Sequence, residues 1–154
     1  MDGKTLAPFR WLVKKKDNMM AFKKGIKDLV AEAEAEVKTL SLQDAIARHG
    51  SDDLMFVDVR DIRELERDGM IPGAYHAPRG MLEFWFDPDS PYFKEALGDE
   101  NTTYVFYCAA AWRSALSVKT LQDMGMTNAV QFADGFKAWK EAGGPVGERP
   151  ARDA

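Results

Sequence analysis

Hydrophobic and polar positions along this chain follow two different periods. From about residue 37 onward, short apolar runs typical of buried parallel strands alternate with segments whose apolar residues recur at helical spacing. Glycine and proline mark several of the boundaries between these segments. The alternation predicts an α/β fold with a mainly parallel sheet. The expected strands are 37–40, 54–59, 74–77, 103–107 and 129–132, and the expected helices are 41–48, 62–67, 112–124 and 136–141.

The segment before these elements is expected to form a helical extension, because its apolar residues between 19 and 37 share one helical face. Asp17 or Asn18 is expected to cap the start of this helix. The apolar face predicts packing on the same chain or on a second copy, so we consider a homodimer through residues 19–37. The chain then divides into an N-terminal helical extension (1–36), one α/β domain (37–148) and a tail (149–154). The residues of the face are Met19, Phe22, Ile26, Leu29, Val30, Ala33 and Val37.

Composition narrows the class of protein. The 154 residues are 45% hydrophobic and carry a net charge of −4, which is typical of one globular domain and does not favour a nucleic-acid partner. No apolar run is long enough to span a membrane, and no secretory signal is visible at the start, so we expect a cytoplasmic protein without a membrane partner. Two histidines and a single cysteine give no metal-ligand spacing, so neither a metal nor a cofactor is expected.

The single cysteine, Cys108, directly follows the clearest strand and precedes a loop of small residues that leads into a helix. Ligands bind at this end of the strands in open parallel sheets. Small side chains allow backbone N–H groups to form a nest, and the start of the helix adds unpaired N–H groups. Arg113 adds a positive charge, and such surroundings lower the pKa of a thiol. We therefore expect an exposed thiolate in an anion-binding loop. A buried structural cysteine is the alternative.

From about Thr39 to Pro145 the chain resembles the rhodanese-like domains, and in particular the single-domain sulfurtransferases. Four motifs in the proper order carry the resemblance. They are Phe56-Val57-Asp58-Val59-Arg60; Glu64 followed by Gly69-Met70-Ile71-Pro72-Gly73-Ala74-Tyr75-His76-Ala77-Pro78; the strand and loop from Tyr104 to Ser114; and Gly135-Phe136-Lys137-Ala138-Trp139 with Gly143-Gly144-Pro145.

The resemblance implies a rhodanese-like open parallel sheet of about five strands with helices on both faces. It also implies that Cys108 takes a sulfur atom from a sulfane donor as a persulfide and passes it to a thiophilic acceptor. The substrate-binding loop would comprise Ala109, Ala110, Ala111, Trp112, Arg113 and Ser114, whose backbone N–H groups stabilise the sulfur anion. Arg113 would bind the anionic part of the donor. Since the chain has no second cysteine, the acceptor would be an external thiol, cyanide or a protein.

Two further points concern the shape and the edge of this site. Ala111 stands where many members of the family have glycine, and a positive φ there costs alanine on the order of 1 kcal/mol. Asp58 and Arg60 end the first long strand on the ligand side. We expect them to form a structural ion pair, and Arg60 is the better candidate of the two for a substrate contact.

Two other functions compete with sulfur transfer. Cysteine-dependent phosphatases and arsenate reductases also place a thiolate beside an arginine, but their usual loop has one more residue than the four between Cys108 and Arg113. A non-catalytic rhodanese-like module that binds or regulates a partner is the second competitor, although such modules usually lack the cysteine. The aromatic residues between 84 and 93 either cover the mouth of the site or pack on the sheet edge.

Overall fold

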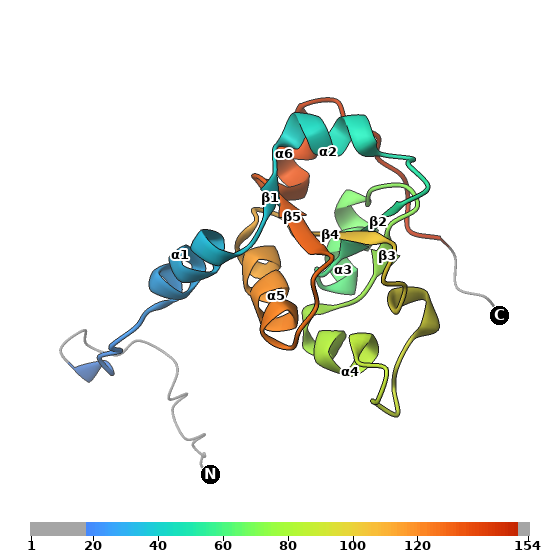
Figure 1. The fold of residues 1–154 in the computed structure, drawn as a ribbon. Coiled ribbons are helices and arrows are strands. Elements are labelled where there is room, and N and C mark those ends of the chain that lie inside the picture. The colour runs from blue at the N-terminus through green and yellow to red at the C-terminus, as the bar shows by residue number, and fades with distance from the viewer. Residues whose placement is uncertain (1–17, 151–154) are drawn as a thin grey trace, which may run out of the picture.

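The computed structural model of the protein describes residues 18–150 and contains a sheet of five parallel strands in the order β1-β5-β4-β2-β3 (Figure 1). This architecture confirms the predicted α/β class and the expected five strands. The strands are β1 (Thr39–Leu40), β2 (Leu54–Asp58), β3 (Tyr75–His76), β4 (Thr103–Tyr107) and β5 (Ala129–Phe132).

Helices cover both faces of the sheet, and each face has its own hydrophobic core. One core joins the sheet to residues of α4 and α5, and the other joins it to residues of α2 and α6. The helices are α1 (Ile26–Glu36), α2 (Leu42–Arg48), α3 (Ile62–Asp68), α4 (Leu82–Phe86), α5 (Trp112–Asp123) and α6 (Gly135–Glu141), with short 3₁₀ turns η2 (Arg79–Met81) and η3 (Glu95–Leu97). Among residues 18–150, no helix is long and apolar enough to cross a membrane.

Strand β4 shows how the sequence assigns side chains to the two cores. Successive side chains of a strand point to opposite faces. Accordingly, Tyr104 and Phe106 belong to the core under α5, whereas Val105 and Tyr107 belong to the core under α6. Cys108 continues the first series and joins the α5 core. The alternation therefore decides which face of the sheet carries the thiol.

The N-terminal helix is shorter than the sequence predicted. It begins at Ile26 rather than near residue 19, and its N-cap is Gly25, whose N–H donates to the Asp28 carboxylate at 2.9 Å. Glycine has a low helix propensity, which favours a helix end at this position. Asn18 does not cap the helix, and Asp17 lies outside the described residues, as do the rest of 1–17 and 151–154.

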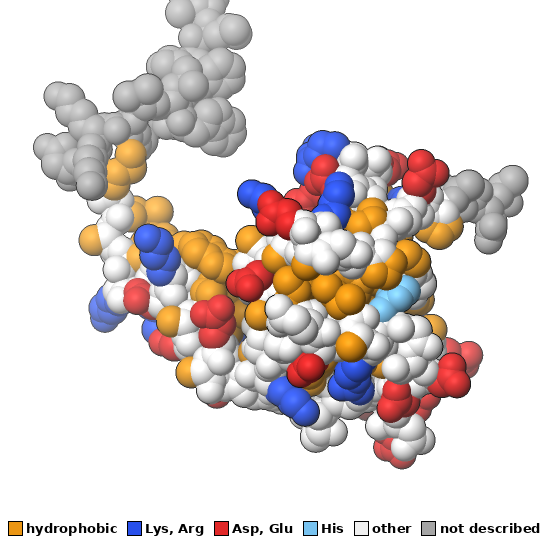
Figure 2. Space-filling model, turned by 90° about the horizontal axis from the view of Figure 1, so that it is seen from above, with side chains coloured by type: hydrophobic (Ala, Val, Ile, Leu, Met, Phe, Trp, Pro, Cys, Tyr) orange, Lys and Arg blue, Asp and Glu red, His pale blue; other side chains and the backbone are white. Residues whose placement is uncertain are grey.

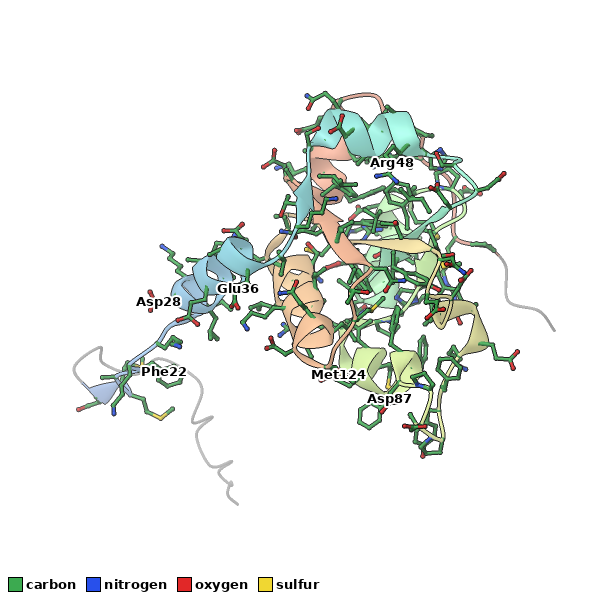
Figure 3. All side chains as sticks on the ribbon, viewed as in Figure 1. Phe22, Asp28, Glu36, Arg48, Asp87 and Met124 are labelled. Atoms are coloured by element: carbon green, nitrogen blue, oxygen red, sulfur yellow. The ribbon has the colours of Figure 1, made fainter. Side chains whose placement is uncertain are left out.

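Part of the predicted apolar face is covered by the same chain. Val30, Ala33 and Val37 are buried, and α1 packs against α5, where Lys119 forms an ion pair with Glu36 at 3.1 Å. The residues nearer the N-terminus stay exposed, and Figure 3 places Phe22 beyond the start of α1, away from the sheet. Figure 2 shows hydrophobic side chains along this segment. The exposed large side chains here are Met19, Met20, Phe22, Ile26 and Leu29.

The aromatic stretch is divided between core and surface. Phe86 is buried, with ring centroids 5.6 Å from Tyr104 and 5.4 Å from Phe106 on β4. Phe84 and Tyr92 are exposed and contact each other edge to face at 6.3 Å. The interpretation as packing on the sheet therefore holds for Phe86.

Candidate active site

Cys108 lies just beyond the carboxyl end of β4, in the core between the sheet and α5. Only 1% of its surface is exposed, so the expectation of an exposed thiol was wrong. The reason is the alternation of β4, which turns this residue inward beside Val59, Ala77 and Leu82.

The loop after Cys108 is held from outside by the turn before α6. The N–H of Phe136 donates to the Cys108 carbonyl at 2.8 Å, and the N–H of Lys137 donates to the Ala109 carbonyl at 3.2 Å. This approach requires Gly135, because a Cβ at that position would lie 2.5 Å from the Ala109 carbonyl oxygen. Since these carbonyls are engaged at α6, the loop direction is set by a segment more than twenty residues further along the chain.

The N–H groups of the loop are left without acceptors. Within residues 18–150, no protein atom accepts a hydrogen bond from the N–H of Ala109, Ala110 or Ala111. Ala111 adopts φ 70° and ψ 7°, the left-handed conformation anticipated from its place in the family motif, and α5 begins immediately after it. The first N–H groups of a helix also lack partners within the helix. The loop that follows Cys108 thus has a series of N–H groups that no other part of the described chain engages.

Ser114 provides the direct contact to the sulfur. Its N–H donates to Cys108 Sγ at 3.4 Å, and its Oγ lies 3.7 Å from the same sulfur. Its side chain is fully buried. Because α5 begins only two residues earlier, the orientation of this helix brings the N–H group to the sulfur.

Arg113 does not present a free positive charge to the site. Its Nη1 lies 3.1 Å from both carboxylate oxygens of Glu64 on α3. The pair is partly buried, with 34% of the Arg113 side chain and 21% of the Glu64 side chain exposed. Trp112 before it is 45% exposed. The cation expected to attract an anionic donor is therefore neutralised within the protein.

Arg60 is a structural residue in this geometry, and the expected substrate contact is corrected. Arg60 is 1% exposed and Asp58 is 0% exposed. The Arg60 Nε and Nη2 atoms donate to the two Asp58 carboxylate oxygens at 3.0 and 2.8 Å, and Nη2 also donates to the Gly69 carbonyl at 2.8 Å. The guanidinium carbon lies 4.3 Å from the centre of the Phe136 ring. These contacts hold the end of β2 in place, as expected for a structural ion pair.

Comparison with known proteins agrees with this arrangement. The sequence profile of the rhodanese-like domain matches residues 41–142. This chain belongs to the rhodanese-like domain family. The match leaves α1 and β1 outside and includes Cys108, its loop and α6.

Individual relatives differ in their described activities. A structure from Rhodopseudomonas palustris, described as a protein of unknown function and possible tyrosine phosphatase, is 48% identical, with a TM-score of 0.81 over 84% of this chain and 98% of that one. The mouse thiosulfate sulfurtransferase/rhodanese-like domain-containing protein 3 is 30% identical over 58% of this chain, which spans 59% of that relative. The thiosulfate sulfurtransferase of Pseudomonas aeruginosa shares the fold, with a TM-score of 0.68 at 21% identity over 82% of this chain and 23% of that one.

Two polar residues that sequence reasoning missed are connected to the sulfur through Ser114. Gln131 on β5 is 1% exposed, and its Oε1 accepts a hydrogen bond from Ser114 Oγ at 2.7 Å. Its Nε2 donates to Thr39 Oγ1 on β1 at 3.1 Å. The signal in the sequence was a lone glutamine inside the apolar run of β5, because a polar residue in a buried strand needs partners.

Other features of the rhodanese-like domain lie apart from Cys108. A cavity of about 340 Å³ is lined by Asp87, Met124 and Tyr104, among others, at the opposite end of β4 (Figure 3). Tyr104 is near the start of β4, whereas Cys108 follows its end. In the part of the chain that the structure describes, no three His, Cys, Asp or Glu side chains come together as metal ligands.

Proposed function

We propose that the protein is a sulfurtransferase in which Cys108 carries the transferred sulfur as a persulfide. The Cys108 thiolate attacks the sulfane sulfur of the donor, and the bond between that sulfur and the rest of the donor breaks. The remainder leaves with the bonding electron pair, as sulfite from thiosulfate or as a thiolate from a hydropersulfide. A thiophilic acceptor then attacks the outer sulfur of the Cys108 persulfide and releases the thiolate again.

The observation that supports this proposal is the set of donors around Cys108. The sulfur receives the Ser114 N–H at 3.4 Å, and the neighbouring N–H groups of Ala109, Ala110 and Ala111 have no acceptor within residues 18–150. Donors that are in place before the reaction stabilise negative charge on sulfur at no cost of rearrangement. A thiolate, and then the terminal sulfur of a persulfide, would fill this position.

The burial of Cys108 and the pairing of Arg113 restrict the donor. Because the thiol is 1% exposed, side chains that cover the sulfur move when a donor binds, while the loop N–H groups stay in place. Because Glu64 holds Arg113, charge on the donor next to the transferred sulfur is met mainly by backbone N–H groups. The acceptor comes from outside the chain, as a thiol, cyanide or a protein, since no second cysteine is present.

The proposal is tested by mass spectrometry and by thiocyanate formation. Wild-type protein treated with thiosulfate or a hydropersulfide should gain one sulfur atom, which a reductant removes. It should also form thiocyanate from the donor and cyanide, whereas Cys108→Ser should do neither. Ser117→Ala, which removes a buried hydroxyl bonded to the Arg113 carbonyl, serves as a control on the same helix. Full thiocyanate formation by Cys108→Ser would overturn the proposal.

A phosphatase activity is the second candidate, because the relative from R. palustris is described as a possible tyrosine phosphatase. Against it, only four residues separate Cys108 from Arg113, one fewer than in the usual phosphatase loop, and Arg113 is already bound to Glu64. Hydrolysis of an aryl phosphate by the wild type that is lost in Cys108→Ser would favour this candidate. A folded wild type that neither gains sulfur nor hydrolyses phosphate would favour a non-catalytic module.

The homodimer through residues 19–37 remains a separate proposal. Val30, Ala33 and Val37 are buried within one chain, so a second copy would cover the exposed side chains from Met19 to Leu29. Sedimentation of the wild type and of Phe22→Ser tests it, with a dimer expected only for the wild type. A monomeric wild type at the concentration used in the assays would contradict the proposal.

A further inference from the structure

The hydroxyl group of Ser114 lies between the Gln131 amide and the Cys108 sulfur and has one proton to donate. It is 2.7 Å from Gln131 Oε1 and 3.7 Å from Cys108 Sγ. A serine hydroxyl donates a single hydrogen bond, although it can accept others. The short distance shows that its proton is directed to Gln131, which leaves the lone pairs of Oγ facing the sulfur. In this arrangement Cys108 receives only the Ser114 N–H.

Gln131 is held in this orientation from the edge of the sheet. It pairs with Thr39 in the register of β1 and β5, and its Nε2 donates to Thr39 Oγ1 at 3.1 Å. With the amide nitrogen turned towards Thr39, the amide oxygen faces Ser114. Both side chains nearest the sulfur are isolated from water, since Ser114 is 0% and Gln131 is 1% exposed. Water therefore cannot replace the hydrogen bond between Ser114 and Gln131 without movement of the core, whereas Thr39 at the sheet edge is exposed.

We infer that Gln131, oriented by Thr39, is a positioning residue that withholds the Ser114 hydroxyl from the Cys108 thiolate and so lowers the reactivity of the free protein. The inference rests on the proposed role of Cys108 as the nucleophile. A thiolate can only accept hydrogen bonds, and hydrogen bonds to a charged acceptor are stronger than those between neutral groups. Because the Ser114 hydroxyl donates its hydrogen bond to Gln131, the thiolate does not receive that hydrogen bond.

The location of Thr39 connects this arrangement to the N-terminal helix. Thr39 begins β1, and only Val37 and Lys38 separate it from the end of α1. The family match begins at residue 41, after Thr39, so the orienting residue lies outside the matched segment. The site thus includes a hydrogen-bonding partner from the segment that joins α1 to the domain.

The charged groups around the loop would not produce the expected difference in Cys108 reactivity between the wild type and the variants. The two arginines nearest to it are each paired with a carboxylate, and the variants used below change none of these groups. The charged or titratable side chains on the elements around Cys108 include Asp58 and Arg60 at the end of β2, Glu64 on α3, His76 on β3, Arg79 on η2, Glu83 on α4, Tyr104 and Tyr107 on β4, Arg113, Lys119 and Asp123 on α5, and Asp134 and Lys137 at the start of α6.

The rate of alkylation by iodoacetamide tests the inference, because Cys108 is the only cysteine in the chain. Gln131→Met removes the acceptor and retains an unbranched side chain, so the Ser114 hydroxyl becomes free to donate to the thiolate. We expect alkylation near neutral pH to accelerate on the order of tenfold, a factor equal to about 1.4 kcal/mol. The pH at half-maximal rate should move downward. Thr39→Val retains the branched shape but removes the hydroxyl group, so it should also accelerate alkylation, by a smaller factor. Thr39→Ser retains the hydroxyl group and should leave the alkylation rate at the wild-type value.

A double variant separates positioning from a loss of packing. In a Ser114→Ala background the hydroxyl is absent, so Gln131→Met should no longer accelerate alkylation. The matched control is Gln122→Met on α5, whose amide donates to the Glu36 carbonyl at 3.3 Å and should leave the rate unchanged. Urea unfolding of each variant shows whether a faster alkylation rate is accompanied by a lower free energy of unfolding, which would attribute it to lost stability.

Two results would overturn the inference. One is a rate for Gln131→Met equal to or below the wild type, and the other is equal acceleration with and without the Ser114 hydroxyl. Alkylation does not require sulfur transfer, so its outcome is independent of the persulfide assay. A protein that forms no persulfide but shows the expected alkylation rates would refute the proposed function and leave the positioning role of Gln131 standing.

Discussion

The chain offers two Asp–Arg pairs with the same sequence spacing and opposite exposure, which makes the role of Arg60 testable. In Asp58–Arg60 the side chains are 0% and 1% exposed, whereas in Asp61–Arg63 they are 47% and 82% exposed. Breaking a buried pair leaves the remaining charge without compensation and costs about 3–5 kcal/mol. For a chain of this size, each kcal/mol lowers the melting temperature by about 2–4 °C. We therefore expect Asp58→Asn to lower it by roughly 6–20 °C.

Thermal and urea unfolding, followed by circular dichroism, measure this effect. Asp61→Asn is the control, because Asn also caps helix starts well and the Asp61–Arg63 pair lies in water. It should lower the melting temperature much less than Asp58→Asn does, because water screens the exposed Asp61–Arg63 pair. Replacing both members of the buried pair, as in Asp58→Leu with Arg60→Met, should recover much of the lost stability, since no unpaired charge remains.

A particular outcome would refute the structural assignment of Arg60. If Asp58→Asn destabilised the protein no more than Asp61→Asn, the buried pair would not hold the end of β2. If, in addition, Arg60→Met kept the stability but raised KM for the sulfur donor, the original expectation of a substrate contact would be correct after all.

Three further predictions concern the loop and its surroundings. Glu64→Gln frees Arg113 from its carboxylate partner, so kcat/KM with the dianion thiosulfate should rise about tenfold, which corresponds to about 1.4 kcal/mol. With a neutral hydropersulfide kcat/KM should rise much less, and equal increases for both donors would contradict the electrostatic explanation. Ala111→Gly should raise the free energy of unfolding by up to about 1 kcal/mol, because φ 70° strains alanine but not glycine. A lower free energy of unfolding in urea would show that the alanine methyl group stabilises the protein by more than the strain costs. Hydrogen bonds from Arg63 lower the pKa of Asp61 from 3.8 to about 2, so the stability that the Asp61 carboxylate contributes is complete above pH 3.8 and is lost as the pH falls through about 2. An NMR titration should place the midpoint of the Asp61 carboxyl at about 2, and Arg63→Ala should move that midpoint back towards 3.8.

The local pattern of the chain was sufficient to predict most of the elements. The apolar run 103–107 became β4 at the predicted residues, and Ser41 caps α2 by accepting the Asp44 N–H at 3.0 Å. These features depend on near neighbours in the chain, so a sequence pattern can predict them. The predicted start of α1 was wrong because residues 19–25 were assigned to a helix on periodicity alone, although Gly25 lies within that segment.

The candidate site, like the fold, was predicted only in part from the sequence. The sequence by itself identified Cys108, the small residues after it and Arg113, because they are consecutive. Only the tertiary structure decided that the thiol is buried, that Glu64 neutralises Arg113 and that Ser114 gives its proton to Gln131. Each of these contacts joins residues from different elements. The direction of a side chain and the partner it meets depend on sheet register and helix packing, which no local pattern in a single sequence contains.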